Sequence, residues 1–164
     1  MKKRSLILSL VVLVTGSIMC GGTPALAETF KNEPDGFGGI KWGTDISTLS
    51  GMKCAINPLD SNINSCRKKK DKLQIGGAKL SIISYEFYKD KFSSVTIFTE
   101  GPVNFNAIKD VFFMKFGSGK QENEYIKRWY WTGDITNIVL DYNEPSQSGT
   151  LYIFSQKINQ ARHP

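Results

Sequence analysis

Apolar and polar residues alternate along two neighbouring stretches near the middle of the chain, residues 80–88 and 92–99. Alternation with a period of two predicts strands that bury one face. The polar residues between them, 89–91, have the composition of a tight turn. The two stretches therefore predict a β-hairpin.

A helix is predicted directly after this hairpin, because the apolar spacing lengthens to three and four residues. Pro102 and Asn104 suit the first turn of a helix, and Gly117 suits its end. The residues that define the apolar face of this helix are Phe105, Ile108, Phe112 and Phe116.

Shorter patterns predict elements on both sides of this segment. Residues 37–44 predict a short strand that Trp42 anchors to the core, and a short helix is expected from Thr44 or Asp45 to Gly51. Residues 53–74 are rich in Asn, Ser and Lys, so we expect an irregular excursion with one short strand near its start. Three further strands are expected at residues 127–132, 135–143 and 149–156.

This order predicts an α+β fold: an antiparallel β-meander sheet with two helices packed on one face. A helix followed by a meander occurs twice, which is compatible with two related halves, although the residues show no repeat. We expect one domain over residues 37–158, between a flexible N-terminal arm at 28–36 and a C-terminal tail at 159–164.

Residues 1–27 have the pattern of a cleavable secretory signal. Basic residues at positions 2–4 precede an apolar run over 6–19, and Ala25 and Ala27 place small side chains before the expected cut. The run is shorter than the roughly 20 residues of a membrane-spanning helix. We therefore expect a periplasmic or secreted protein without a transmembrane segment.

The three cysteines also bear on the compartment of the protein and on how it is anchored. Cys20 could become a lipidated N-terminus, but Met19 departs from the usual lipobox, so lipid anchoring is the less favoured alternative. Cys54 and Cys66 would then remain as a pair, which predicts a disulfide in an oxidising compartment. C-x-x-C spacing is absent and the single histidine is His163, so we expect no metal and no cofactor.

The stretch Phe37-x-x-Ile40-x-Trp42-Gly43-Thr44 resembles the opening of a group of small exported bacterial proteins of unknown function. The resemblance continues through a Y-x-F-Y-x-x-x-F-x-x-V pattern, an N-F-x-x-[IL]-K helix and W-x-G and L-D-Y segments, and it covers most of the chain after the signal. The matching residues are Tyr85, Phe87, Tyr88, Phe92, Val95, Asn104, Phe105, Ile108, Lys109, Trp131, Gly133, Leu140, Asp141 and Tyr142. The resemblance implies no activity, because that group has no assigned role.

Charge identifies a first candidate for binding. The formal net charge of +6 falls to +3 when residues 2–4 leave with the signal, which gives no support to a nucleic-acid partner. The densest basic run extends from Arg67 to Lys72 and could hold an acidic glycan, lipopolysaccharide phosphates or another anionic envelope surface. The alternative is a solvated loop, which is the commoner role of such runs.

Aromatic strands give a second candidate. Alternation puts Trp129 and Trp131 on one face of their strand and Tyr130 on the other, and neighbouring strands add rings to both faces. The predicted helix can cover only one face, so the other could receive a protein or glycan partner or a second subunit. The alternative is burial, the usual fate of large rings. The predicted binding residues are Tyr85, Phe87, Trp129, Tyr130, Trp131, Tyr152, Lys68, Lys69 and Lys70.

Motifs of enzymatic chemistry are absent from the sequence, which contains no G-x-S-x-G, no H-E-x-x-H and no P-loop. An enzyme is therefore the least favoured class, and it would take the form of a hydrolase that uses a carboxylate pair near Asp134 or Asp141. The sequence favours an exported binding or interaction protein of unknown ligand. The alternative is a cell-envelope assembly or structural protein without a small-molecule ligand.

Overall fold

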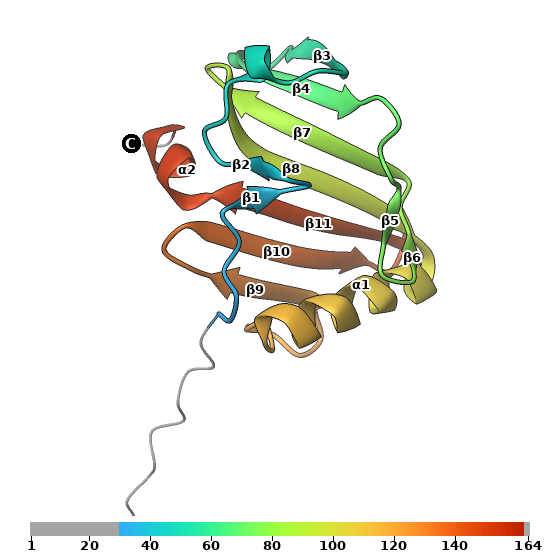
Figure 1. Ribbon diagram of the computed structural model, residues 1–164. Coiled ribbons are helices and arrows are strands. Elements are labelled where there is room, and N and C mark those ends of the chain that lie inside the picture. Colours follow the sequence, from blue (N-terminus) through green and yellow to red (C-terminus); the bar gives the residue numbers. More distant parts are fainter. Residues whose placement is uncertain (1–29, 163–164) are drawn as a thin grey trace, which may run out of the picture.

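A seven-stranded antiparallel sheet dominates the computed structural model, which describes residues 30–162 (Figure 1). The predicted signal at residues 1–27, Cys20 and His163 lie outside the described residues. The strand order is β3-β4-β7-β8-β11-β10-β9, so the last strands of two successive meanders pair in the centre. The prediction of an α+β fold with an antiparallel sheet is confirmed. The strands of this sheet are β3 (Met52–Asn57), β4 (Asp60–Lys68), β7 (Ile82–Tyr88), β8 (Lys91–Glu100), β9 (Arg128–Thr132), β10 (Thr136–Asn143) and β11 (Ser148–Ser155).

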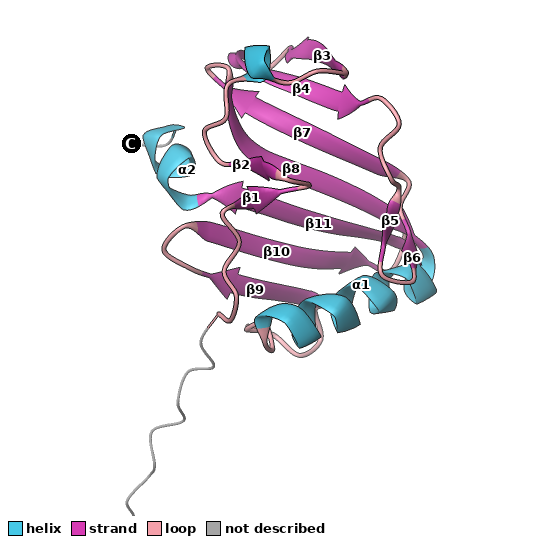
Figure 2. Cartoon of the chain, viewed as in Figure 1, coloured by secondary structure: helices cyan, strands magenta, loops and turns pink. Residues whose placement is uncertain are grey.

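Two small hairpins and three helical elements surround the sheet. The hairpins pair β1 (Gly36–Phe37) with β2 (Ile40–Lys41), and β5 (Gln74–Ile75) with β6 (Ala78–Lys79). The helical elements are the 3₁₀ helix η1 (Ile46–Thr48) and the α-helices α1 (Gly101–Phe116) and α2 (Gln156–Arg162). Figure 2 shows α1 and the β1–β2 hairpin on the same side of the sheet.

The side of the sheet that faces α1, here called the inner face, forms the core. Tyr85, Val95 and Ile153 are neighbours across β7, β8 and β11, and all three are buried. From the hairpin side, the ring of Phe37 lies 6.1 Å from that of Tyr85, between centroids. Trp42 anchors its segment as predicted, because its ring stacks on Phe92 at 4.8 Å.

Helix α1 covers the other half of the inner face. Pro102 occupies its first turn, where a missing N–H costs nothing, and Gly117 ends it with a φ of 84° that favours glycine. The carbonyl of Gly117 accepts a hydrogen bond of 2.8 Å from the indole of Trp131. The four residues predicted to form the apolar face of α1 are all buried: Phe105, Ile108, Phe112 and Phe116.

The segment expected to be irregular is largely strand: the short strand expected near its start is β3, and the expectation of irregular structure after it is corrected by β4. Residues 53–74 contribute most of β3 and all of β4, which pair with each other and through β4 with β7. The polar composition arises because β3 is an edge strand with exposed side chains. Cys54 and Cys66 are directly opposite in this ladder and form the predicted disulfide.

The ends of the domain also differ from expectation. The short helix predicted near Asp45 is the single 3₁₀ turn η1, capped by the Asp45 carboxylate. The tail expected from residue 159 is helical to Arg162, whose side chain reaches Asp60 at 3.8 Å. The described part of the N-terminal arm is fixed, since Glu33 accepts hydrogen bonds from the backbone N–H groups of Ile135 and Thr136.

Candidate functional site

The face of the sheet opposite α1, here called the outer face, is a continuous surface in cross-strand register. Tyr130, Val139 and Tyr152 are direct neighbours across β9, β10 and β11. Thr96 and Ser84 continue the same row across β8 and β7. All five side chains are partly exposed. The outer face therefore combines aromatic rings with small hydroxyl side chains.

A second row runs parallel to the first. Ile82, Phe98 and Thr150 are neighbours across β7, β8 and β11, and Phe98 is 39% exposed on a central strand. The row ends at Asp141 and Arg128, which form an ion pair at 2.7 Å. This ion pair raises the pKa of the Arg128 guanidinium, because its side chain donates a hydrogen bond to Asp141.

The predicted aromatic binding residues are divided between the two faces. The exposed fractions of Tyr85, Phe87 and Trp131 are only 1%, 0% and 3%. Trp129 is partly buried beneath α1, with its ring 5.9 Å from that of Phe105. These four rings belong to the core side of the sheet, which corrects their assignment as partner-contacting residues. The alternative of burial by the N-terminal segment and a helix is the one that the contacts support.

Tyr130 lies on the outer face, as alternation from Trp129 and Trp131 predicts, and Tyr152 lies on the same face because both are cross-strand partners of Val139. The ring of Tyr152 stacks on Phe154 with centroids 4.8 Å apart and an interplanar angle of 26°. Burial raises the pKa of the Tyr152 phenol above its ordinary value. These two tyrosines are the members of the predicted aromatic set that a partner could reach.

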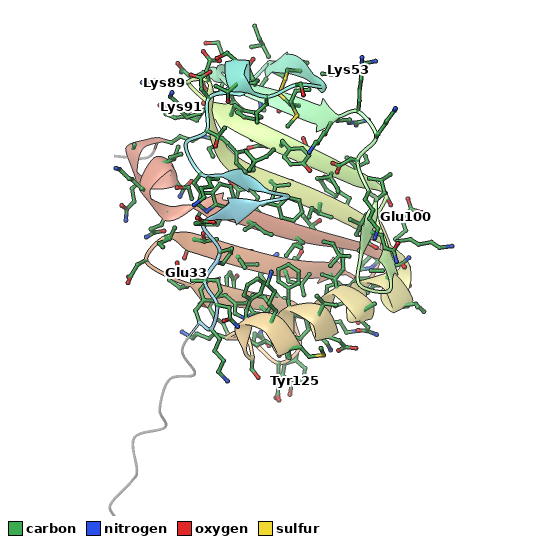
Figure 3. The ribbon with its side chains drawn as sticks, in the orientation of Figure 1. Glu33, Lys53, Lys89, Lys91, Glu100 and Tyr125 are labelled. Atoms are coloured by element: carbon green, nitrogen blue, oxygen red, sulfur yellow. A yellow bond between two sulfur atoms is a disulfide. The ribbon has the colours of Figure 1, made fainter. Side chains whose placement is uncertain are left out.

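The basic run forms part of a larger patch at the β3–β4 end of the sheet. We call it the basic cluster, and its members are Lys53, Arg67, Lys68, Lys69, Lys70 and Lys72. All six side chains are exposed. Arg67 follows the inward-facing Cys66, so it belongs to the outer face, and Figure 3 shows Lys53 on the neighbouring edge strand. Within residues 30–162, no ion pair joins any member of the cluster to a carboxylate.

Two cations of the cluster are held directly opposite each other. Lys53 and Arg67 are Cα partners in the β3–β4 ladder, next to the disulfide-bonded pair Cys54 and Cys66. Like charges directly opposite in a sheet destabilise it. Because the disulfide prevents the register from slipping, the chain keeps this repulsion in the folded state.

A hollow of about 300 Å³ opens beside the cluster. Arg67, Lys68 and Lys70 line it, together with the apolar side chains of Leu73 and Ile82. Ile82 belongs to the second row of the outer face, so the hollow joins the basic cluster to that face. A negatively charged group in the hollow would have three cations around it and one carboxylate, that of Asp71, which also lines the hollow.

The acid within the basic run is oriented toward the core. Asp71 accepts a hydrogen bond of 2.8 Å from the hydroxyl of Tyr85. Burial, and next this hydrogen bond, raise the pKa of the Tyr85 phenol. The Asp71 carboxylate is thus engaged in holding the loop to the sheet.

Several other carboxylates are held in surface ion pairs. Glu144 pairs with Lys127 at 2.7 Å and Asp45 with Lys91 at 3.0 Å. Hydrogen bonds from the side chain and then the backbone of Ser47, more than Lys91, lower the pKa of Asp45 to about 2. Across residues 30–162, no three His, Cys, Asp or Glu side chains gather to form a metal site.

Lys53 is the member of the basic cluster that sequence reasoning missed. The two cysteines could have identified Lys53, because a disulfide between adjacent antiparallel strands places the flanking residues in register. Lys53 precedes Cys54 and Arg67 follows Cys66, so a cross-strand disulfide implies the pairing of these two cations.

No family model, curated protein or solved structure matches the chain. The resemblance of residues 37–44 to the opening of small exported bacterial proteins therefore stays a prediction.

Proposed function

We propose that this protein is an exported binding protein that recognises an acidic glycan across the outer face of its sheet. The observation that carries the proposal is the basic cluster, which places Lys53 directly opposite Arg67 with no ion pair to a carboxylate of residues 30–162. Such a cost to stability is expected where the charge serves an external partner. A polymer with regularly spaced anionic groups would neutralise several of these cations at once.

The outer face supplies the remaining contacts that a glycan requires. The rings of Tyr130 and Tyr152 can pack against sugar carbons, and their hydroxyl groups can form hydrogen bonds. Ser84 and Thr96 add hydroxyl groups between these rings and the basic cluster. A surface that inserts into a membrane would carry several exposed Trp, Phe and Leu side chains beside its cations, whereas the apolar side chains that line the hollow with the cluster's cations include one exposed leucine, Leu73, and the partly buried Ile82. We therefore favour an acidic glycan over a lipid surface.

Export agrees with two structural findings. The Cys54–Cys66 disulfide is formed, and disulfides persist in oxidising compartments such as the periplasm or the extracellular space. No helix within the described residues 30–162 is long and apolar enough to cross a bilayer. The secretory signal at residues 1–27 supplies the proposed route.

Heparin, a sulfated glycan, is the probe that tests this proposal. We expect the triple variant K68Q/K69Q/K70Q to elute from immobilised heparin at a clearly lower salt concentration than the unchanged protein. The matched control K79Q/K115Q/K120Q removes the same number of exposed lysines elsewhere. Equal shifts for both variants would show that net charge alone governs retention and would contradict a localised site.

A second measurement separates glycan from membrane. Vesicles of phosphatidylglycerol and phosphatidylcholine present anionic charge without sugar, and the variant Y130S removes one accessible ring. We expect weak, fully salt-sensitive vesicle binding and a loss of heparin retention in Y130S. Strong vesicle binding with little heparin retention would instead indicate an envelope-surface role and overturn the glycan proposal.

A further inference from the structure

A pocket of about 620 Å³ lies at the end of the sheet where α2 begins, far along the strands from the basic cluster. We call it the end pocket. Four segments wall it: the residues after β2, the β7–β8 turn, the β9–β10 turn and α2. Figure 3 shows Lys89 and Lys91 at the same end of the sheet as α2. The volume of the end pocket falls within the range of ligand pockets, roughly 300–1,000 Å³.

Apolar side chains form the walls of the end pocket. The indole nitrogen of Trp42 donates a hydrogen bond of 2.7 Å to Thr136 Oγ1, so its polar atom is satisfied. Ile135 and Ile158 add aliphatic surface, and Ile135 is 49% exposed although it is a large hydrophobic residue. Covering such surface is favourable by about 25 cal/mol per Å², which an apolar ligand would gain.

Charge at the rim of the end pocket is mostly positive. Lys89, Lys91 and Lys157 line the pocket against one carboxylate, that of Asp134. Lys91 is engaged by Asp45, whereas Lys89 lies over the ring of Tyr88 with its nitrogen 5.4 Å from the centroid. Within the described residues, no carboxylate forms an ion pair with Lys89 or Lys157.

Backbone hydrogen bonds hold the walls of the end pocket in place. The N–H of Gly43 donates to the carbonyl of Phe92 at 2.9 Å, which fixes the Trp42 wall to β8. The N–H of Gln156 donates to the carbonyl of Ile135 at 2.8 Å, which joins the start of α2 to the β9–β10 turn. A ligand would therefore bind a preformed cavity and would not have to order its walls.

We propose that the end pocket binds a single-chain anionic amphiphile, a hydrocarbon tail that carries one carboxylate or phosphate. The tail packs against Trp42, Ile135 and Ile158, and the anionic group lies at the rim between Lys89 and Lys157. The apolar interior and the cationic rim together select this ligand class, because each matches one end of such a molecule. The end pocket shares none of the residues proposed to contact the glycan, so it is independent of the proposed glycan function.

Calorimetric titration of the protein purified after export tests the proposal with three ten-carbon amphiphiles below their micelle-forming concentrations. Decanoate and decyl phosphate carry the two candidate head groups, and decyltrimethylammonium carries the opposite charge. We expect both anions to bind and the cation to bind far more weakly. The stronger of the two anions identifies a fatty-acid-like or a phosphate-headed ligand. Equal affinity for decanoate and decyltrimethylammonium would overturn the proposal.

Variants locate the bound amphiphile. K89Q/K157Q should weaken decanoate binding about tenfold, as expected for two partly exposed ion pairs. The control K115Q/K120Q should leave the affinity unchanged. Ile135→Asp, in an exposed turn, should abolish binding while urea unfolding confirms that the domain is intact. Unchanged affinity in K89Q/K157Q would contradict an anion-selective pocket.

Discussion

The repulsive pair in the basic cluster predicts a variant that gains stability and loses binding. Lys53→Glu replaces a like-charged cross-strand pair with an attractive one opposite Arg67. A cross-strand pair contributes about 0.2–1 kcal/mol, and this substitution both removes a repulsion and adds an attraction. Since both side chains are exposed and screened by solvent, we expect a gain of about 0.5–1.5 kcal/mol in the free energy of unfolding.

Urea unfolding at low and high salt measures this gain. The Debye length is about 10 Å at 0.1 M and about 3 Å at 1 M ionic strength, so the gain should be present at low salt and largely lost at 1 M NaCl. Lys79→Glu is the matched control, because its cross-strand partner Gln74 is uncharged. The same Lys53→Glu protein should elute earlier from heparin.

Two results would refute this reasoning. If Lys53→Glu were no more stable than Lys79→Glu at low salt, the two cations would not repel each other in the folded state. If the gain persisted unchanged at 1 M NaCl, its origin would be packing or strand propensity and not charge. Either result would remove the main physical argument that the basic cluster is maintained for an external partner.

Three further predictions concern stability. Reduction of the Cys54–Cys66 disulfide, at a sequence separation of 12, should lower the free energy of unfolding by about 3 kcal/mol in the chain-entropy treatment; an unchanged urea midpoint with dithiothreitol would contradict this. Trp42→Phe keeps a stacking ring but loses the indole hydrogen bond, so thermal unfolding should show a loss of about 1–2 kcal/mol, and no loss would mean that this bond is unimportant. Hydrogen bonds from Ser47 lower the pKa of Asp45 below its unfolded value near 3.8, so its stabilising effect is present above pH 4 and is lost as pH falls toward 2. Asp45→Asn should flatten that part of the stability profile, and an unchanged profile would assign the acid sensitivity to other groups.

The parts of the fold that could be predicted from the sequence are those where one face of an element is clearly apolar. The helix with Phe105 and Phe112 and the hairpin around residues 89–91 are examples, because burial against the sheet imposes a single period on each element. Their boundaries differ from the expectation by only a few residues.

The strand expected near Cys54 is present as β3, whereas β4 was missed because only Ile63 and Cys66 of its residues are buried. An edge strand is stabilised by hydrogen bonds to its neighbour, and β3 keeps most of its side chains in solvent, so no apolar alternation marks it. The short helix α2 escaped prediction in the same way. Its seven residues carry little helical signal of their own, and contacts such as Arg162 with Asp60 form only in the folded chain.

The candidate site was predicted in part. Alternation correctly separated Tyr130 from Trp129 and Trp131, but it could not indicate which face would be covered. That choice depends on Phe37 and Trp42, which reach the inner face from the start of the domain. The end pocket is formed by four segments distant in sequence, and no local pattern of residues could have indicated it.

The contact of Glu33 with the β9–β10 turn fixes an order of events during biosynthesis. Its partners Ile135 and Thr136 follow it by 102 and 103 positions, so the ribosome makes the first residues of the domain long before their binding site exists. The central pairing of β8 with β11 is delayed in the same way. The nascent chain therefore cannot complete its fold until almost all of it has been synthesised.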